Sequence, residues 1–410
     1  MKKKLLISIL IISIFVIGCS NSDSQKVTPN TEITTKQWNR LVNSSKETIV
    51  NVVYYTNNEK ELMNWLKNDF TKDIKLRYDI SLRFTFKDFN KLKNSLVEKS
   101  KEDEKTVYDL IFISSKGFKT LKKNELLYQK TLLNLPNYYK NLQGEKYITE
   151  YLEGIKIENQ AVPVFKNQLI FVHNEDDIYE TPKSFDEFLD FAKEYKNKVS
   201  YIHPKNEVGM AFILSAISSE VDFDEINKLS ANKDEVYQKI KPGLDYLVKL
   251  DKYLYKDGEE YIENTEKMDE LFLNDKLIFS MSMDNNYVTE QIAKTIFPKS
   301  SNSFVIQEGT TGFISYFTIP KMSDNKSGAF VVLNDLISGQ TQSDFYSDIN
   351  INKIPVLNIE TMPNEELRHL KDAKVKYTSV RNDDLYQAYI PEIRPEIREI
   401  IYELWSEYVE

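Results

Sequence analysis

The chain has 410 residues, of which 41% are hydrophobic and 12% aromatic, so it can bury more than one ordinary core and favours two lobes. Its formal net charge of −9 argues against nucleic acid as a partner, because basic patches supply most of the affinity for a phosphate backbone. An acidic surface can also simply keep a protein soluble.

The first expected element is a secretory signal segment. Three lysines at residues 2–4 precede an apolar stretch over residues 5–17, and Gly18 then precedes Cys19. This order is typical of a signal peptide, and the apolar stretch is shorter than the ~20 residues that a spanning helix needs. Residues 16–19, "VIGC", resemble a bacterial lipobox, in which the cysteine thiol receives a diacylglycerol. The resemblance implies that Cys19, the only cysteine, anchors the protein to the outer face of the cell membrane; an ordinary amino-terminal membrane anchor is the alternative.

The next segments alternate between strand and helix patterns. Residues 19–35 are rich in Ser, Thr and Asn and are expected to form a flexible linker. Compact β-branched and aromatic runs predict strands over residues 47–55, 82–89 and 108–114, and apolar periodicity predicts helices over residues 59–70 and 89–105. This alternation indicates a parallel sheet with helices on both faces.

A second unit begins within the strand-rich residues 159–174. Ser184 is expected to cap a helix, with Glu187 completing a capping box. The remaining patterns predict a strand over residues 198–204, a buried helix over 208–218, a helix and then a strand over 259–283, a strand, turn and helix over 317–338, and a closing helix over 391–409.

These elements predict an α/β fold with two doubly wound lobes joined by a hinge. The expected boundaries are a signal peptide over residues 1–18, a linker over 19–35, the first lobe over 36–165 with a return segment at 307–345, and the second lobe over 166–306 with the carboxyl-terminal part at 346–410.

The order of tether, lobe, crossover, second lobe and return segment resembles the extracellular solute-binding lipoproteins of ABC importers, which have a type II periplasmic-binding-protein-like fold. Three stretches support this resemblance: "LIFVHN" followed by "TPKSFDEF", then "LIFSMSMDNN", and "GTTGFISYFTIPKMSDNKSGAFVVLNDLIS". A narrower likeness to the YnjB-like subgroup rests on "YDLIFIS", "KVSYIHPKNEVGMAFI" and "YIPEIRPEIREIIYELW". The segment "YYTNNE" departs from that subgroup, because it lacks the tryptophan and the glycine pair that tend to follow the first strand.

The resemblance implies a function in transport. The chain would capture a small polar or cationic solute, such as a thiamine-like compound, a polyamine, an amino acid or a sugar, and deliver it to ABC permease subunits. It would act as a monomer, outside the cytoplasm and without a cofactor.

The solute is expected beyond the carboxyl ends of the strands, where helix amino termini offer unpaired N–H groups. The candidate ligand-binding residues are therefore those of loops that follow strands or precede helices: Tyr54, Tyr55, Thr56, Asn57, Ser114, Ser115, Asn206, Gly209, Ser282, Asp284, Asn285, Thr310, Thr311 and Gly312.

Several of these candidates have a structural alternative to solute binding. Either tyrosine could pack in the core, the serines could cap a helix, and Asp284, which as a cleft carboxylate would select a cation, could belong to an ordinary turn. Asp109 is expected to order the backbone rather than to bind solute.

No catalytic or metal-binding residue is predicted. The three histidines, His173, His203 and His369, lie far apart without zinc-site spacing, and a packing or surface role is favoured for His203. No nucleophile elbow, phosphate loop or dinucleotide fingerprint occurs in the sequence. Two other functions stay open, namely a surface-anchored hydrolase with a glycosidase-like carboxylate pair, and a sensory or adhesive lipoprotein.

Overall fold

The computed structural model describes residues 33–410 apart from 57–59, 348–350, 352, 361 and 373–376. The signal segment, Cys19 and Asn57 therefore lie outside the described residues. Within the described ranges, no helix combines the length and the apolar composition needed to cross a membrane.

A mixed sheet organises the first core. Its strands are β1 (Ile49–Tyr54), β2 (Ser81–Phe86), β3 (Leu110–Ile113), β6 (Ala161–Gln168), β10 (Thr310–Thr318) and β11 (Tyr389–Pro391). Their order is β11-β10-β3-β1-β2, and β6 also pairs with β10. Strand β1 lies parallel to β2 and β3, as the alternating pattern predicts, whereas β10 runs antiparallel to β3 and β6. All residues of β3 and β6 are buried, which agrees with the apolar sequence of β3 and of the first five residues of β6, whereas β6 ends in the buried polar residues Lys166, Asn167 and Gln168.

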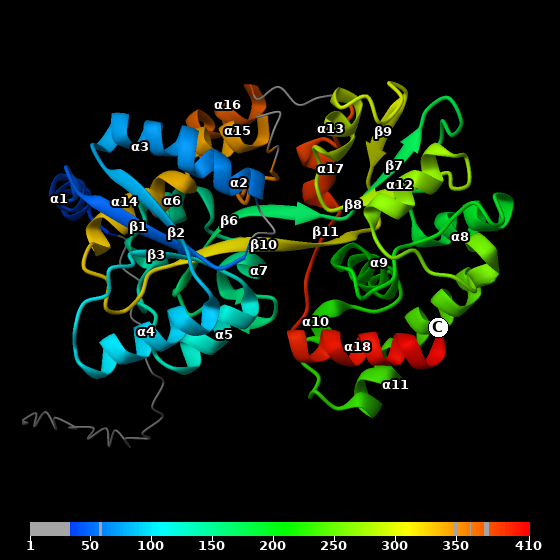
Figure 1. Cartoon of the computed structure of the whole chain (residues 1–410), viewed down its shortest axis with the longest axis horizontal. Coiled ribbons are helices and arrows are strands. Elements are labelled where there is room, and N and C mark those ends of the chain that lie inside the picture. Colours follow the sequence, from blue (N-terminus) through cyan, green and yellow to red (C-terminus); the bar gives the residue numbers. More distant parts are fainter. Residues whose placement is uncertain (1–32, 57–59, 348–350, 352, 361, 373–376) are drawn as a thin grey trace, which may run out of the picture. The chain divides into compact units, whose positions relative to one another are not determined.

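Helices cover this sheet on both sides, and Figure 1 shows α2 and α3 above it and α4 and α5 below it. The helices of this part are α1 (Thr35–Ser45), α2 (Lys60–Trp65), α3 (Thr71–Tyr78), α4 (Phe89–Lys101), α5 (Ser115–Lys123), α6 (Pro136–Asn141), α7 (Lys146–Glu150), α14 (Lys326–Leu336), α15 (Gly339–Ser347) and α16 (Asn364–Asp372). A π-helical turn, Leu66–Phe70, joins α2 to α3, so the helix expected over residues 59–70 continues to residue 78. A short hairpin, β4 (Tyr151–Leu152) and β5 (Ile155–Lys156), follows α7.

The second core contains a smaller sheet, β8-β7-β9, made of β7 (Ile170–Asn174), β8 (Ser280–Ser282) and β9 (Ser301–Phe304). Both pairings are antiparallel, unlike the parallel sheet of a doubly wound lobe. Its helices are α8 (Phe185–Glu194), α9 (Glu207–Ser218), α10 (Phe223–Ile226), α11 (Lys233–Asp251), α12 (Thr265–Leu273), α13 (Tyr287–Ala293), α17 (Asn382–Gln387) and α18 (Pro395–Tyr408).

The strand expected over residues 198–204 does not form. Ile202 makes only an isolated bridge with Ile262, while Tyr201 is fully buried and stacks on Phe212 of α9. A short buried apolar run has the same pattern whether it pairs with a strand or packs under a helix, which is why periodicity alone was misleading here.

The start of α8 is capped largely as predicted. Ser184 accepts a hydrogen bond from the backbone N–H of Glu187 at 3.1 Å. The Glu187 carboxylate accepts from the N–H of Lys183 at 2.7 Å, one residue before the cap. The serine cap is thus confirmed, although the acidic side chain binds the preceding residue and does not close a regular capping box.

Among the described residues, the two largest clusters of buried side chains form the cores, and two smaller clusters also form. Phe112, Phe165 and Phe330 belong to the first, and Phe212 and Trp405 to the second. The chain passes between the two parts where β6 meets β7, between β9 and β10, and between α16 and α17; β11 then pairs with the start of β10, and α18 lies in the second core.

The residues that follow α15 were expected to belong to the second lobe. Ile351, Val356 and Leu357 instead lie in the first core. Gln342 of α15 causes this placement: it accepts a hydrogen bond from the N–H of Val356 at 3.0 Å and donates to a carbonyl of β6 at 2.6 Å.

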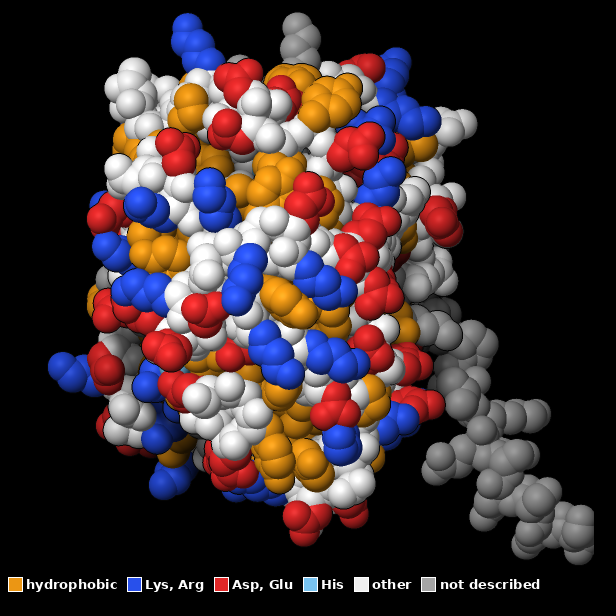
Figure 2. Space-filling model, turned by 90° about the vertical axis from the view of Figure 1, so that its right-hand side faces the viewer, with side chains coloured by type: hydrophobic (Ala, Val, Ile, Leu, Met, Phe, Trp, Pro, Cys, Tyr) orange, Lys and Arg blue, Asp and Glu red, His pale blue; other side chains and the backbone are white. Residues whose placement is uncertain are grey.

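The surface carries charges of both signs. Figure 2 faces the side that lies at the right in Figure 1, and there acidic and basic side chains are interspersed rather than gathered into one basic field.

Candidate functional site

A cavity of about 610 Å³ is lined by residues from both cores, and we call it the cleft. Five of the predicted residues line it: Thr56, Ser114, Asn206, Ser282 and Asp284. Strand β1 lies between β2 and β3 in the sheet, so the chain adds β2 on one side of β1 and then β3 on the other side. An open sheet leaves a crevice at such a switch point, beyond the carboxyl ends of the strands, and this geometry brings the ends of β1 and β3 to the cleft.

Two of these residues cap helices that begin at the cleft. The hydroxyl of Ser114 accepts from the N–H of Gly117 at 3.4 Å at the start of α5. Asn206 Oδ1 accepts from the N–H of Val208 at 2.9 Å at the start of α9. The capping role foreseen for Ser114 is therefore confirmed, and both residues line the cavity as well.

Asp284 belongs to a turn and to an ion pair. Its N–H donates to Ser282 Oγ at 3.0 Å, and its Oδ1 accepts from the N–H of Asn286 at 2.9 Å. Its Oδ2 lies 3.5 Å from Nζ of Lys353, which also donates to Asn167 Oδ1 at 3.1 Å. Lys353 thus offsets the charge of Asp284, which weakens the expectation that this carboxylate alone selects a cation.

Three candidates beside the first sheet do not line the cleft. Tyr54 accepts from Lys67 Nζ at 2.9 Å and packs against Phe86. Tyr55 accepts from the N–H of Ser114 at 2.8 Å, and burial raises its pKa. Ser115 is buried and hydrogen-bonded to the Glu153 carboxylate.

The remaining candidates, from the second core and from β10, do not line the cleft. They pack against other segments or form hydrogen bonds with them. Asn285 bonds the backbone of Val380 through both ends of its amide, at 3.1 and 3.0 Å. Thr310 and Thr311 are fully buried; the hydroxyl of Thr310 accepts from Gln168 at 3.0 Å. Gly209 lies inside α9 in close contact with the carbonyl of Ile202. Gly312 lines a neighbouring cavity instead.

Three glutamates and an arginine that the sequence analysis missed also line the cleft: Glu153, Glu207, Glu392 and Arg398. Glu153 is at the tip of the β4–β5 hairpin, Glu207 begins α9, and Glu392 follows β11. Arg398 Nη1 lies 3.4 Å from Glu392 Oε1. With Asp284 and Lys353, the cleft holds four carboxylates against two cationic side chains.

The carboxyl groups of Glu392 and Glu153 resist ionisation. Burial, and then the charge of Glu153, raises the pKa of Glu392 to about 8, although Arg398 opposes the rise. Burial likewise raises the pKa of Glu153, against the hydrogen bond from Ser115 and the charge of Arg398. A cation in the cleft would stabilise both carboxylates in their ionised form.

One sequence signal could have pointed to Glu153. "YLEGIK" places two turn residues between short strand runs, and both Glu153 and Gly154 have positive φ, +44° and +69°. Such two-residue hairpin turns favour Asn or Gly, so a glutamate there is unusual. The remaining cleft residues come from separate parts of the chain without a local signature.

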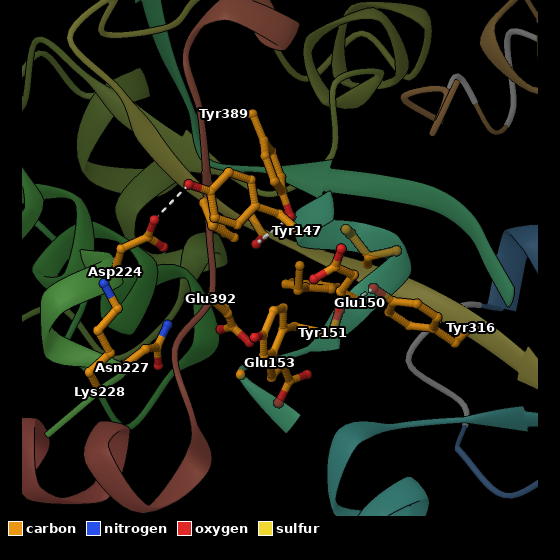
Figure 3. Close-up of a pocket in the computed structure, with 15 residues that line it drawn as sticks. Tyr147, Glu150, Tyr151, Glu153, Asp224, Asn227, Lys228, Tyr316, Tyr389 and Glu392 are labelled. Atoms are coloured by element: carbon orange, nitrogen blue, oxygen red, sulfur yellow. Dashed lines mark hydrogen bonds between the residues drawn. The ribbon is translucent and has the colours of Figure 1, made fainter. Parts of the chain in front are cut away.

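A second cavity, of about 350 Å³, adjoins the cleft (Figure 3). It shares four lining residues with the cleft, Glu153, Phe313, Ile314 and Glu392. Four tyrosines also line it, Tyr147, Tyr151, Tyr316 and Tyr389, and we call it the tyrosine chamber.

Two of the three histidines that were considered have structural contacts. His173 is buried, and its Nδ1 lies 2.8 Å from the carbonyl of Ile178. His203 contacts Trp405 and lies 3.3 Å from a carboxylate oxygen of Glu410. Neither lines the cleft or the chamber, and the described residues contain no group of three or more His, Cys, Asp or Glu arranged to hold a metal ion.

The comparisons with known proteins define the class. The chain belongs to the bacterial extracellular solute-binding protein family, whose profile matches residues 65–358. Among curated proteins it is similar to protein YnjB of Escherichia coli (strain K12), with 28% identity over 240 residues, which are 57% of this chain and 60% of YnjB. The match therefore spans less than two thirds of that relative.

Solved structures share the fold at low sequence identity. The spermidine/putrescine substrate-binding protein PotD of Streptococcus pneumoniae aligns with a TM-score of 0.55 and 15% identity, over 88% of this chain and 100% of that one. The ferric iron-binding protein A of Mannheimia haemolytica, in an open conformation, aligns with a TM-score of 0.56 and 16% identity, over 88% and 98%. These structures confirm the two-lobed, type II periplasmic-binding-protein-like α/β fold.

Proposed function

We propose that this protein is the solute-binding component of an ABC importer and that it captures a small polar or cationic solute in the cleft. The cleft carries the proposal, since polar groups of both cores converge on one cavity in which carboxylates are in excess. Solute sites of this kind are concave and contain a few well-placed polar groups. The named functions of PotD and of the iron-binding protein point in the same direction, since both capture cations.

Capture would involve closure of the two lobes. Ligand-driven hinge closure is a standard motion of two-lobed binding proteins, and it excludes water from the contacts around the solute. The closed form would then deliver its solute to the permease subunits. We propose that the protein acts as a monomer and without a cofactor.

The location outside the cytoplasm follows from the family, and we further propose that Cys19 carries the lipid that holds the protein on the membrane. Each buried acyl CH₂ contributes ~0.8 kcal/mol, so two or more chains give stable anchoring. In cells, Cys19→Ser is expected to move the protein from the membrane fraction to the medium or periplasm and to abolish labelling by radioactive palmitate. Unchanged membrane association and labelling would contradict lipid attachment at Cys19.

A thermal-shift screen of residues 20–410 against amino acids, sugars, polyamines and thiamine tests the binding function. A solute at a hundred times its Kd is expected to add ~2.7 kcal/mol to the free energy of unfolding. The same solutes should be recovered unchanged after incubation, because capture requires no chemistry. Absence of any shift, together with turnover of a glycoside or a peptide, would favour the hydrolase alternative instead.

A further inference from the structure

The tyrosine chamber presents aromatic rings rather than free hydroxyl groups. Tyr147 Oη donates to Asp224 at 2.7 Å, as Figure 3 shows, and Tyr389 Oη donates to the carbonyl of Gly312 at 3.1 Å. Tyr316 Oη, which is buried, lies 3.0 Å and 3.1 Å from the carbonyls of Ile148 and Tyr151. Since these three hydroxyls are bonded within the protein, their rings offer an apolar or aromatic group a surface inside the chamber, beside the polar side chains of Glu150, Asp224, Asn227 and Lys228 that also line it.

Carboxylates form the boundary between the chamber and the cleft. Glu153 and Glu392 line both cavities, and in Figure 3 they lie among the tyrosines of the chamber. Glu207 adds a third carboxylate on the cleft side, where Arg398 is the neighbouring cation, and the chamber is also lined by Glu150, Asp224 and Lys228, so carboxylates outnumber cations there as well. The Asp284–Lys353 pair is balanced in charge. The negative excess therefore lies where the two cavities meet and in the chamber itself.

The backbone at Glu153 is strained. Its φ of +44° lies in the left-handed region, which is unfavourable for a residue with a Cβ. Eleven other non-glycine residues among those described also have positive φ, and Glu153 is the one among the twelve that lines the two cavities. The hairpin thus holds a carboxylate at the junction of the cavities at a cost that a glycine or an asparagine would largely avoid.

Building on the proposed function, we propose that the preferred solute is an organic cation with one apolar or aromatic arm. Its ammonium group lies against Glu153, Glu207 and Glu392, and its arm enters the tyrosine chamber. The aromatic walls beside the carboxylates add cation–π attraction to the charge pairing.

Calorimetric titration of residues 20–410 with matched probes tests this inference. Phenethylamine has the cation and the arm, ethylamine has only the cation, and 3-phenylpropionate has the arm with a negative charge. Phenethylamine is expected to bind at least tenfold more tightly than ethylamine, and 3-phenylpropionate at least a hundredfold more weakly than phenethylamine.

Variants separate the two parts of the site. Glu207→Gln is expected to weaken phenethylamine and ethylamine alike by tenfold or more. Tyr151→Ala should weaken phenethylamine by fivefold or more and leave ethylamine unchanged. Glu399→Gln is the matched control, because Glu399 is an exposed residue of α18 outside both cavities, and it should change neither affinity by more than twofold. Circular dichroism verifies that each variant is folded, and Tyr147→Ala replaces Tyr151→Ala if the latter is not.

The outcomes distinguish this inference from the proposed function. If sugars, amino acids or polyamines shift the melting temperature but phenethylamine binds no more tightly than ethylamine, the inference is wrong and the binding function stands. Equal effects of Tyr151→Ala on both amines would also overturn it. If no solute binds at all, the proposed function itself fails.

Discussion

At Glu392, burial and neighbouring charge oppose ionisation of the carboxyl group. The side chain is 7% exposed, and the carboxylates of Glu153 and Glu207 add to its raised pKa of about 8, while Arg398 is the opposing cation. Tyr389, whose pKa burial raises far above its usual range, also faces it and stays neutral. Without a solute, the cleft therefore holds a proton at neutral pH that an incoming cation would displace.

This pKa predicts how stability depends on pH. In the unfolded chain Glu392 ionises near pH 4.5, whereas in the folded protein it keeps its proton up to about pH 8. The folded state therefore binds more protons between these values, and the free energy of unfolding falls as pH rises from about 4.5 to about 8. Urea denaturation of Glu392→Gln should show a smaller fall over this range, because glutamine stays neutral in both states. A slope equal to that of the Glu399→Gln control would contradict this account.

Single residues differ in how far the sequence could predict them. Asp109 was expected to order the backbone, and its carboxylate accepts hydrogen bonds from the N–H of Asn51 at 2.9 Å and of Asn325 at 3.0 Å. That expectation is confirmed, because a buried carboxylate at the start of a strand commonly accepts backbone N–H groups, although the sequence did not show which segments would supply them. The role of Glu392 depends on distant neighbours, which no local pattern records.

At the scale of elements, the close approach of α9 to the preceding loop depends on a glycine. A Cβ on Gly209 would lie 2.0 Å from the carbonyl oxygen of Ile202 and 2.6 Å from that of His203. Backbone atoms cannot move aside as the end of a side chain can. Gly209 therefore fixes where α9 begins relative to the cleft, although it does not line it.

Gly209→Ala is expected to lower the free energy of unfolding by ~2 to 3 kcal/mol through overpacking. Gly117→Ala in α5 is the comparison, because there the new Cβ would meet side-chain atoms of Tyr55 and Phe89 and no backbone. The gain in helix propensity of ~1 kcal/mol should offset part of that contact, so the loss of stability should be smaller than for Gly209→Ala. Urea denaturation of both variants measures the difference, and equal losses would refute the distinction.

The sequence predicted elements well where a strong local pattern also determines the contacts. Strands β1 and β3 and the buried helix α9 were expected. Each has a continuous or nearly continuous run of apolar residues in the sequence, and each lies largely inside its core. The antiparallel pairing of β7 with β8 and β9 was not, because those strands are short and far apart in the chain. Strand partners at that separation are set by the packing of whole layers rather than by local sequence.

At the scale of the whole molecule, two cores share one cleft and are joined by several passes of the chain. Polar contacts also link elements of the two cores, among them the ion pair of Lys119 with Glu396 and the hydrogen bond of Tyr147 with Asp224. The order of elements predicted this two-lobed organisation, and the family and its fold confirm it. The residues that line the cleft come from five or more separate segments of the chain. For this reason the sequence alone identified only some of them.

The most direct test of the account is the distance between the cores with and without solute. Residues 20–410 contain no cysteine, so Lys91→Cys on α4 and Lys249→Cys on α11, both at exposed positions, can carry spin labels. Pulsed electron paramagnetic resonance should show a shift to shorter label separations at saturating phenethylamine, or at saturating amounts of the strongest solute from the thermal-shift screen. An unchanged distance distribution, measured while calorimetry shows one solute bound per chain, would contradict capture by closure of the two lobes.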